Sequence, residues 1–367
     1  MKIFVLYATA GAGHRRAAEA LYKALKNEPN FDTRIIDCLD YTNSSFAFFH
    51  SWGYIFLIAH LPSVWALIFY LTNSGWLGKP ISYIRSMVDI INSARLRIFL
   101  IKENPDIIVS THFLANAVCC HLKKKHFIKS RLISIVTDFN VHRFWLADNI
   151  DTYIVACEKT RDVLLKEGVD QDLIKVLGIP VDPVFSSDLN RDELCEKLSI
   201  KKDAFTVLIL TSAVGIGPLE NLANILKDKV QMLMVCGTNK RLFEKLRLKE
   251  SPSLRVFGMV DNMHELMAVS SMIITKAGGL TTSEALVMRL PMVFLSLVPG
   301  QEVYNAIILS QYKTAHRAKN LKDINNLVLN YKNNPAELEN MREAIDSVRR
   351  PHATADIVNL VKDYARG

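Results

Sequence analysis

The sequence lacks both a cysteine framework and an export signal. It contains six cysteines, none of them in a C-x-x-C pair, and the only adjacent ones are Cys119 and Cys120. That spacing suits neither a zinc site nor an ordinary disulfide. The start, Met1–Val5, is typical of a first β-strand and lacks the basic head, long apolar middle and small-residue cleavage site of a signal peptide. We therefore expect a protein of the reducing cytosol.

A strong excess of one charge is also missing. Lys and Arg total 45 and Asp and Glu total 37, which gives a formal net charge of +8. That excess does not by itself indicate nucleic acid, although it favours an anionic membrane or a phosphate ligand. Half of the 367 residues are hydrophobic and 22% are charged, which excludes a disordered or fibrous chain. The length predicts two domains.

One long segment has no charge at all. The 38 residues from Tyr41 to Gly78 contain no Asp, Glu, Lys or Arg. Pro62 divides this segment and leaves 16 residues, 46–61, before it, which is short of the roughly 20 needed to span a bilayer. The segment is rich in aromatic residues: Phe46, Phe48, Phe49, Trp52, Phe56, Trp65, Phe69 and Trp76.

The protein's excess positive charge follows directly after this segment. Residues 79–143 carry 11 Lys or Arg and only 4 Asp or Glu. Aromatic side chains can enter the acyl boundary of a membrane while basic neighbours meet anionic headgroups. We favour membrane docking over two alternatives, a helical hairpin buried in the first domain and a true span. The residues expected to dock are Phe48, Phe49, Trp52, Phe56 and Trp65.

Apolar runs of strand length alternate with amphipathic helical patterns in both halves of the chain. The expected strands are Ile3–Tyr7, Thr33–Ile36, Ile107–Ser110, Leu132–Val136, Tyr153–Ala156, Thr206–Thr211, Gln231–Cys236, Leu254–Phe257, Met272–Thr275 and Met292–Ser296. Segment 178–187, with two prolines, suits a linker. This alternation predicts two doubly wound α/β domains with a cleft between them and a final amphipathic helix over Val348–Tyr364.

A glycine-rich turn follows the first expected strand and contains Gly11, Gly13 and His14. Such a turn aims backbone N–H groups at an anion or a reacting oxygen. A dinucleotide fingerprint, with Asp37 as its ribose acid, would need Gly or Ala where Arg16 stands. His14 could instead act as a general base for a hydroxyl, or merely cap the helix.

A second glycine turn, Gly278-Gly279, lies between a strand and a helix that Thr281 or Thr282 could cap. Such a turn binds phosphate through its N–H groups, and Glu284 in the following helix could accept two ribose hydroxyls. Gln301 and Glu302 could bind sugar hydroxyls. A plain strand–helix loop is the alternative. The only D-x-D, at 170–172, is expected to be a solvated loop without a metal.

These residues together resemble a known family. The Gly11-Ala-Gly13-His14 turn, Thr137-Asp138-Phe139 and His142-Arg143-Phe-Trp145 are similar to monogalactosyldiacylglycerol synthases and processive diacylglycerol β-glucosyltransferases. So are the segment Gly178–Pro183 and the block that runs from Asp261-Asn262 to Asn305. The matches are ordered along about 300 residues, and the family belongs to glycosyltransferase family 28.

The resemblance implies a GT-B fold, α/β, with two Rossmann-like domains facing a cleft. Residues 1–183 would form an acceptor domain, 184–345 would bind UDP-sugar, and a helix within 346–367 would return to the first domain. An inverting enzyme would move a hexose, glucose or galactose, to diacylglycerol at the cytoplasmic face of the cell membrane, as a peripheral monotopic protein. No metal, cofactor or nucleic acid is expected.

The resemblance also implies roles for individual residues. His14 or Asp138 would be the catalytic base, and Gly11, Gly13 and His112 would surround the acceptor. The donor would contact Gly215, Met259, Val260, Gly278, Gly279, Leu280, Thr281, Glu284, Gln301 and Glu302.

One segment departs from the family pattern. At 211–214, side chains replace the glycines found in many relatives, which limits how closely backbone can approach a ligand. This departure leaves a non-catalytic UDP-sugar or lipid sensor open. Two other enzymes also stay open: the N-acetylglucosaminyltransferase of the lipid-linked peptidoglycan precursor, which shares the fold and the membrane address, and an NAD oxidoreductase, which rests on Gly11, Gly13 and Asp37.

Overall fold

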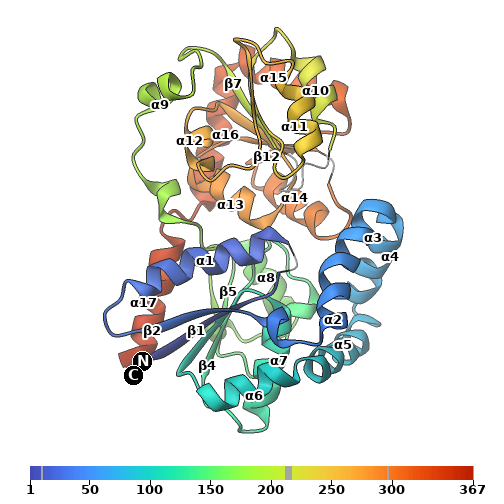
Figure 1. Ribbon diagram of the computed structural model, residues 1–367, viewed down its shortest axis with the longest axis vertical. Helices are drawn as coiled ribbons and strands as arrows, with labels where there is room; N and C mark the ends of the chain where they lie inside the picture. The colour runs from blue at the N-terminus through green and yellow to red at the C-terminus, as the bar shows by residue number, and fades with distance from the viewer. Residues whose placement is uncertain (10, 211–216, 296, 367) are drawn as a thin grey trace. The chain divides into compact units, whose positions relative to one another are not determined.

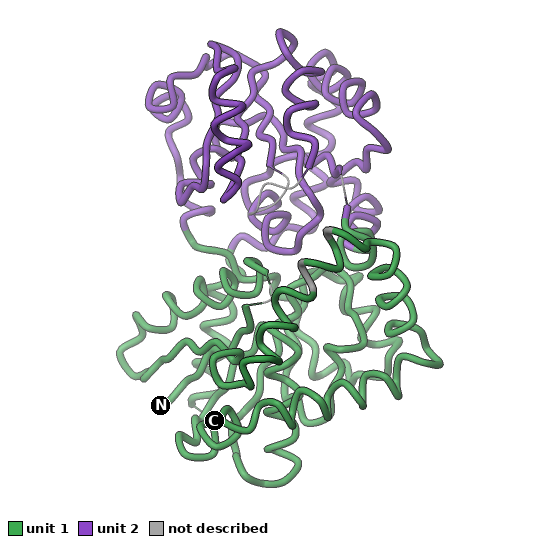
Figure 2. Tube along the Cα trace, turned by 45° about the vertical axis from the view of Figure 1, so that its right-hand side comes forward, with its two compact units in different colours: residues 1–183, 298–304, 352–367 green, residues 184–297, 305–351 purple. Residues whose placement is uncertain are grey.

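The computed structural model describes residues 1–9, 11–210, 217–295 and 297–366 (Figure 1). The chain divides into two compact units, coloured separately in Figure 2. Unit 1 comprises residues 1–183, 298–304 and 352–367, and unit 2 comprises residues 184–297 and 305–351.

Unit 1 is built on a six-stranded parallel sheet in the order β2-β1-β3-β4-β5-β6. Its strands are β1 (Lys2–Tyr7), β2 (Asp32–Asp37), β3 (Ile107–Ser110), β4 (Arg131–Ile135), β5 (Thr152–Ile154) and β6 (Ile174–Lys175). At the centre, Val5 of β1 pairs with Ile35 of β2 on one side and Val109 of β3 on the other. β3 is buried at every position, which explains its uninterrupted apolar sequence.

Helices cover both faces of this sheet (Figure 1). Leu21 of α1 (Ala12–Lys26) and Ile357 of α17 (Ala353–Arg366) pack on one face. Leu96 of α6 (Ala94–Glu103), Leu114 of α7 (Phe113–Lys124) and Leu164 of α8 (Glu158–Lys166) pack on the other. The final helix was predicted to begin at Val348, and this start is wrong: α16 ends there and α17 begins after Pro351, because proline cannot continue a helix.

The uncharged segment forms most of a helical excursion between β2 and β3. It comprises α2 (Ser44–Phe48), a π-turn (Phe49–Gly53), α3 (Tyr54–His60), α4 (Pro62–Asn73) and then α5 (Gly78–Asn92). Pro62 stands at the first position of α4, where its missing N–H leaves no bond unmade. In the described chain no single helix is long and apolar enough to cross a membrane, although the bent pair Ser44–Ile58 and Pro62–Asn73 meets the length and composition test together.

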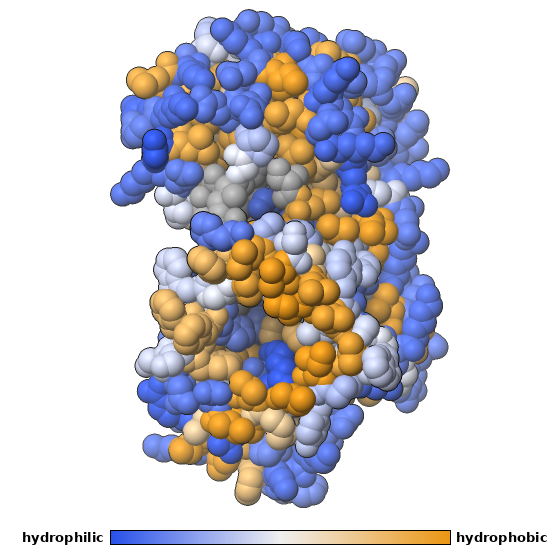
Figure 3. Space-filling model, turned by 90° about the vertical axis from the view of Figure 1, so that its right-hand side faces the viewer, coloured by the Kyte–Doolittle hydropathy of each residue, from blue (hydrophilic) through white to orange (hydrophobic). Residues whose placement is uncertain are grey.

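Most aromatic side chains of this segment face outward. Phe48, Phe49, Trp52 and Phe56 are 56% to 70% exposed, and Trp76 is 85% exposed. Figure 3 shows apolar side chains gathered on the face of the molecule that carries α3 and α4. Of the eight aromatic residues of this segment named above, only Phe69 is buried, so the alternative of a buried hairpin is wrong.

Unit 2 holds a second six-stranded parallel sheet, in the order β12-β11-β10-β7-β8-β9. Its strands are β7 (Thr206–Leu210), β8 (Gln231–Val235), β9 (Leu254–Phe257), β10 (Met272–Thr275), β11 (Met292–Phe294) and β12 (Ala315–Arg317). Its helices are α9 (Arg191–Lys197), α10 (Leu219–Leu226), α11 (Lys240–Arg247), α12 (Met263–Ala268), α13 (Gly279–Val287), α14 (Gln301–Gln311), α15 (Leu321–Asn333) and α16 (Pro335–Val348). The first four residues of α14 belong to unit 1. Two parallel sheets with flanking helices confirm the predicted pair of Rossmann-like domains.

Candidate active site

His14 stands in the first turn of α1, directly after β1. The preceding Gly11 has φ +112°, a backbone conformation that favours glycine, and no side chain caps the helix. The His14 ring Nδ1 lies 2.9 Å from the Thr111 carbonyl oxygen and 2.8 Å from Thr137 Oγ1. Thr111 and Thr137 follow β3 and β4, so three neighbouring strand ends fix one imidazole, as expected at the carboxyl edge of a parallel sheet.

These contacts define the tautomer of His14. A carbonyl oxygen can only accept, so Nδ1 carries the proton and donates it to Thr111, which leaves the Nε2 lone pair free. Burial lowers the pKa of His14, although the Asp138 charge and the Thr111 hydrogen bond act in the opposite direction. The positive end of the α1 dipole also favours the neutral ring. His14 therefore has the form that a general base requires at neutral pH.

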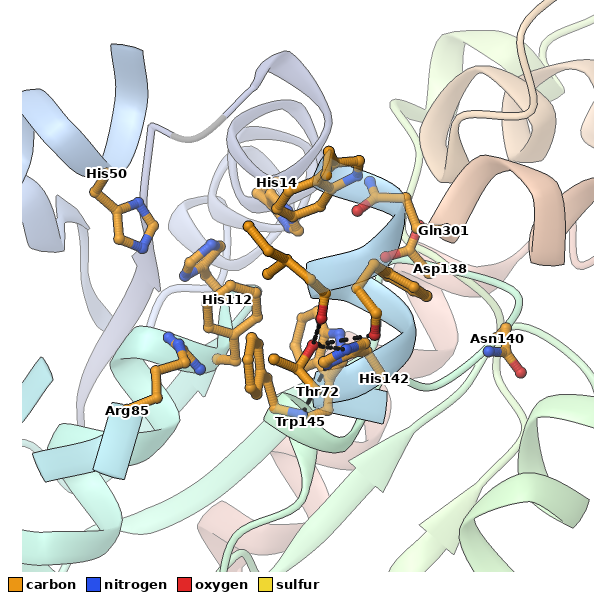
Figure 4. Close-up of a pocket in the computed structure, with 15 residues that line it drawn as sticks. His14, His50, Thr72, Arg85, His112, Asp138, Asn140, His142, Trp145 and Gln301 are labelled. Atoms are coloured by element: carbon orange, nitrogen blue, oxygen red, sulfur yellow. Dashed lines mark hydrogen bonds between the residues drawn. The ribbon is translucent and has the colours of Figure 1, made fainter. Parts of the chain in front are cut away.

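A cavity of about 210 Å³ in unit 1 surrounds this ring. Its apolar walls are Trp65, Ile68, Phe69, Phe113, Phe144 and Trp145, and its polar lining is His14, His50, Thr72, Arg85, His112, Asp138, Asn140, His142 and Gln301. Figure 4 shows Asp138 and Gln301 near His14 on one side, with Arg85, His112 and His50 on the other. Although nine of these fifteen residues are polar, most of the surface that lines the cavity is apolar, which suits a substrate that is itself mostly apolar.

His142, which lines this cavity, is hydrogen-bonded to Thr72 of α4. Its Nδ1 accepts from the Phe144 N–H at 3.2 Å, so Nε2–H donates to Thr72 Oγ1 at 3.1 Å. The Thr72 hydroxyl in turn donates to the Ile68 carbonyl at 2.8 Å. Burial lowers the pKa of His142 to about 4, so the ring is neutral at pH 7.

Two more histidines and an arginine form the opposite wall. The His112 ring lies 4.7 Å from the His14 ring and 5.4 Å from the His50 ring, between ring centres. Burial lowers the pKa of both, that of His50 to about 4, and the nearby Arg85 lowers both further. Arg85, on α5, donates to Asp89 at 2.5 Å.

Helix α4 also positions the loop that leads to Gln301. Trp65 Nε1 donates to the Pro299 carbonyl at 3.0 Å. Gly300 has φ +94°, and a Cβ there would lie 2.6 Å from Cγ of Phe69, so no other residue fits without movement. Trp65, expected to dock on a membrane, is half-buried and lines the pocket, unlike the exposed Phe48 and Phe49.

Unit 2 contains the second glycine turn, at the start of α13. Gly278 is the residue before the helix and has no side-chain cap, so the prediction that Thr281 or Thr282 caps it is wrong. The Thr282 hydroxyl instead donates back to the Gly278 carbonyl at 2.7 Å, within the helix. Asn305 Nδ2 holds the turn by donating to the Ala277 carbonyl at 3.0 Å. The first N–H groups of α13 receive no side-chain cap, as an anion site requires.

The other residues predicted to bind the donor are divided between the units. Glu284 and Leu280 are buried on α13, Thr281 is half-buried there, and Met259 is 56% exposed with Val260 half-buried beside it. Gln301 and Glu302 belong to unit 1, where Glu302 accepts from the Val298 N–H at 2.7 Å. Gly215 and segment 211–214 lie outside the described residues.

The Asp37 carboxylate accepts hydrogen bonds from neighbouring residues of unit 1. It accepts from the Thr9 hydroxyl and from the Leu39 N–H at 3.0 Å. These bonds join β2 to the turn after β1 and weaken the ribose role that an NAD enzyme would need. Asp170 likewise accepts from the Asp172 N–H at 3.0 Å and caps a short turn.

The sequence prediction missed five polar residues of the pocket: His50, Thr72, Arg85, Asn140 and His142. His142 was singled out only as part of a family motif. The signal for Arg85 was its spacing of four from Asp89, which places both on one helix face. Nothing in the sequence showed that this face would line a cavity.

The fold defines a class, the two-domain Rossmann-like glycosyltransferase architecture. It is similar to the crystal structure of MurG from Acinetobacter baumannii, with a TM-score of 0.63 and 14% identity over 99% of both chains. It is equally similar to the S. aureus MnaA–UDP co-structure, with a TM-score of 0.63 and 15% identity over 100% of this chain and 97% of the other. At these identities the likeness establishes the fold alone.

Sequence comparison identifies the family. Residues 14–181 match the monogalactosyldiacylglycerol synthase model, and residues 216–356 match the glycosyltransferase family 28 C-terminal domain. Processive diacylglycerol β-glucosyltransferases are similar to this chain along almost their whole length. The one from Bacillus cytotoxicus is 28% identical over 98% of this chain and 93% of its own chain. The one from Bacillus pumilus is 28% identical over 100% of this chain and 98% of its own chain. The chain belongs to this family of glycosyltransferases, as the sequence motifs predicted.

Proposed function

We propose that this glycosyltransferase moves a hexose from a UDP-sugar to the free hydroxyl of diacylglycerol at the cytoplasmic face of a membrane and forms a β-glycoside. The observation that carries the proposal is His14, a neutral imidazole with a free Nε2 in a largely apolar pocket. The names of the relatives, diacylglycerol β-glucosyltransferases, support the same acceptor.

The proposed reaction is a direct displacement at the anomeric carbon. His14 Nε2 takes the hydroxyl proton, the lipid oxygen forms the new bond to the anomeric carbon, and the bond to UDP breaks on the opposite face. The imidazolium that forms is stabilised by the Thr111 carbonyl and by the Asp138 charge, since both raise the pKa of His14. Asp138 is the rival base. Because its charge favours the protonated ring, we assign it to support His14.

Unit 2 supplies the donor site in this proposal. The uncapped N–H groups at Gly278-Gly279 would bind the diphosphate, and Glu284 would accept the ribose hydroxyls. Such N–H groups stabilise a leaving UDP without a metal, so we expect turnover to persist in EDTA.

Membrane docking would bring the acceptor to this pocket. The exposed Phe48, Phe49, Trp52 and Phe56 belong to the same helical excursion as Trp65 and Phe69, which line the cavity. A lipid held by this excursion at the bilayer surface would need to move its glycerol end only a short way to reach His14.

The test uses the full chain, anionic vesicles with and without diacylglycerol, and UDP-glucose, UDP-galactose or UDP-N-acetylglucosamine. UDP release and lipid products are followed together. We expect one glycolipid, made from UDP-glucose or UDP-galactose and only when diacylglycerol is present. UDP binding without a lipid product would contradict the proposal and favour a sensor. Transfer of N-acetylglucosamine to a peptidoglycan lipid precursor instead would favour the second enzyme.

A further inference from the structure

Arg85 is held in a fixed position at the wall of the pocket. Its guanidinium lies 3.9 Å above the centre of the Phe113 ring and 4.4 Å from that of Phe144. One of its terminal nitrogens donates to Asp89, which is almost fully buried one helical turn further along α5. Two aromatic faces and a carboxylate therefore restrict the guanidinium before any ligand binds.

The guanidinium keeps donors for a ligand. Among the described residues Asp89 is the only side chain to which it donates a hydrogen bond, although a guanidinium has five N–H groups. Its side chain retains 17% exposure, and Arg85 is one of the residues that line the cavity. The neighbouring His50 contributes a second unused group, because its Nδ1 is buried with no hydrogen-bond partner in the described structure.

The charge of this wall suits a neutral oxygen rather than an anion. Asp89 balances Arg85 directly, and burial keeps the pKa of His50, His112 and His142 below its usual value, so these rings are neutral at pH 7. Asp138 adds a carboxylate to the lining. An added phosphate monoester would meet no unbalanced positive charge among these residues, whereas a carbonyl oxygen needs only a donor.

A chain of ring contacts connects Arg85 to His14 along the lining of the cavity. The ring centres of His14 and His112 are 4.7 Å apart, those of His112 and Phe113 are 3.9 Å apart, and Arg85 stacks on Phe113. Figure 4 shows His112 between His14 and Arg85. In a 1,2-diacylglycerol, the ester carbonyl on the neighbouring carbon is only a few bonds from the reacting hydroxyl. A recess with a hydrophilic floor opens among the apolar side chains in Figure 3.

We infer that Arg85 is a specificity-determining residue that donates to an ester carbonyl of the acceptor and so selects acyl lipids over their ether analogues. This inference rests on the proposed function and adds the part of the lipid that is recognised. A dialkylglycerol lacks the carbonyl oxygen that projects from the acyl chain, so it leaves the Arg85 donors without that acceptor.

The experiment compares 1,2-dioctanoylglycerol with 1,2-di-O-octylglycerol as acceptors for the full chain. The measured quantity is the ratio of kcat/KM for the diester to kcat/KM for the diether. We expect the wild type to favour the diester by about 10- to 100-fold, the range for a hydrogen bond to a charged group. In Arg85→Met this ratio falls towards one, and in Arg85→Lys it is intermediate.

Controls separate recognition from folding. Arg85→Met leaves Asp89 unpaired, so Arg85→Met/Asp89→Asn is measured as well and should show the same lowered ratio. Arg95→Met removes another arginine, which donates to the Thr42 carbonyl outside the pocket, and should keep the wild-type ratio. A structural role alone would lower both kcat/KM values equally and leave the ratio unchanged.

Each outcome decides the inference. Equal use of both acceptors by the wild type, an unchanged ratio in both Arg85→Met proteins, or Arg85-dependent competition by phosphatidate would overturn the role of Arg85 and leave the proposed function intact. Transfer to neither glycerolipid would overturn the proposed function and this inference together.

Discussion

In each unit a strand leads through a glycine into a helix, although the two glycines differ in backbone conformation: Gly11 has φ +112° and Gly278 has φ −74°. In unit 1, β1 leads through Gly11 into α1, and in unit 2, β10 leads through Gly278 into α13. Neither helix has a side-chain cap or an acidic residue in its first turn. Within the described part of the chain, therefore, no side chain caps either helix start, and each turn presents a positive helix end.

The two turns also differ in the side chains that follow Gly11 and Gly278 in the first turn of each helix. α1 carries His14 in its first turn, fixed by Thr111 and Thr137 inside a largely apolar cavity. The first turn of α13 carries small and aliphatic residues, and Thr282 bonds back to its own helix. Under the proposed function, the turn in unit 1 serves proton transfer and the turn in unit 2 serves anion binding, and the neighbouring side chains account for this difference.

The largest expected effect comes from removing the ring in unit 1. His14→Ala should lower kcat by about 10²- to 10⁴-fold, because no base takes the acceptor proton. UDP affinity, measured by calorimetry, should stay near the wild-type value. His126→Asn, at an exposed histidine, is the matched control. Wild-type turnover in His14→Ala would show that His14 is not the base and that the turn in unit 1 has no role in proton transfer.

The next effect tests the proposed membrane docking and whether it depends on the exposed aromatic side chains of unit 1. The triple change Phe48→Ser, Phe49→Ser and Trp52→Ser should weaken binding to anionic vesicles by about 100-fold or more, since exposed aromatic area no longer enters the bilayer. Vesicle sedimentation measures it. Leu248→Ser in unit 2, where the side chain is 89% exposed, should bind like wild type. Sedimentation of the triple variant at the wild-type level would show that another surface docks.

A moderate effect is expected in unit 2. Glu284→Gln should raise the KM for the UDP-sugar by about 10- to 100-fold, because two ribose hydroxyls lose a charged acceptor. The binding of vesicles should not change. The thermal unfolding midpoint is measured alongside, since Glu284 is buried. An unaltered donor KM in a folded variant would remove Glu284 from the ribose site.

The smallest effect concerns stability and pH. His50 has a pKa of about 4 when folded, below its usual 6.5, so between these pH values the unfolded chain binds more protons and stability falls as pH drops. The burial of Asp89, which raises its pKa to about 6, acts in the opposite direction. Comparing the variant His50→Phe with the wild type measures the contribution of His50 alone, because Asp89 is present in both proteins.

Urea unfolding at pH 7 and pH 4.5 measures this effect. Acidification should cost His50→Phe less free energy of unfolding than wild type, by on the order of 1–3 kcal/mol. An identical loss in both proteins would mean that His50 titrates normally and that the pocket of unit 1 is wetter than described.

The sequence predicted the sheets better than the pocket. Strands such as Ile107–Ser110 and Leu254–Phe257 match because buried parallel strands have continuous apolar sequences. β6 and β12 were missed, since two or three residues form no pattern. The threonine cap was predicted wrongly because the Thr282 hydroxyl has a closer acceptor in its own helix.

Within the candidate site, His14 was predictable because a glycine turn and its position after a strand both mark it. Arg85 was not predictable, because its position in the pocket depends on contacts with Phe113 and Phe144. These two residues lie 28 and 59 residues away in sequence. Which face of an amphipathic helix meets a cavity is a property of tertiary packing. The division of roles between acceptor and donor domains stays a prediction.

The most direct test of the central claim is the anomeric configuration of the product. The full chain is incubated with diacylglycerol vesicles and the UDP-hexose that it turns over, and the purified glycolipid is analysed by proton NMR. Direct displacement assisted by His14 predicts a β-glycoside from the α-linked donor. An α-glycoside, formed with retention, would contradict the account, because it requires a covalent or ion-pair intermediate that the neutral His14 base does not provide.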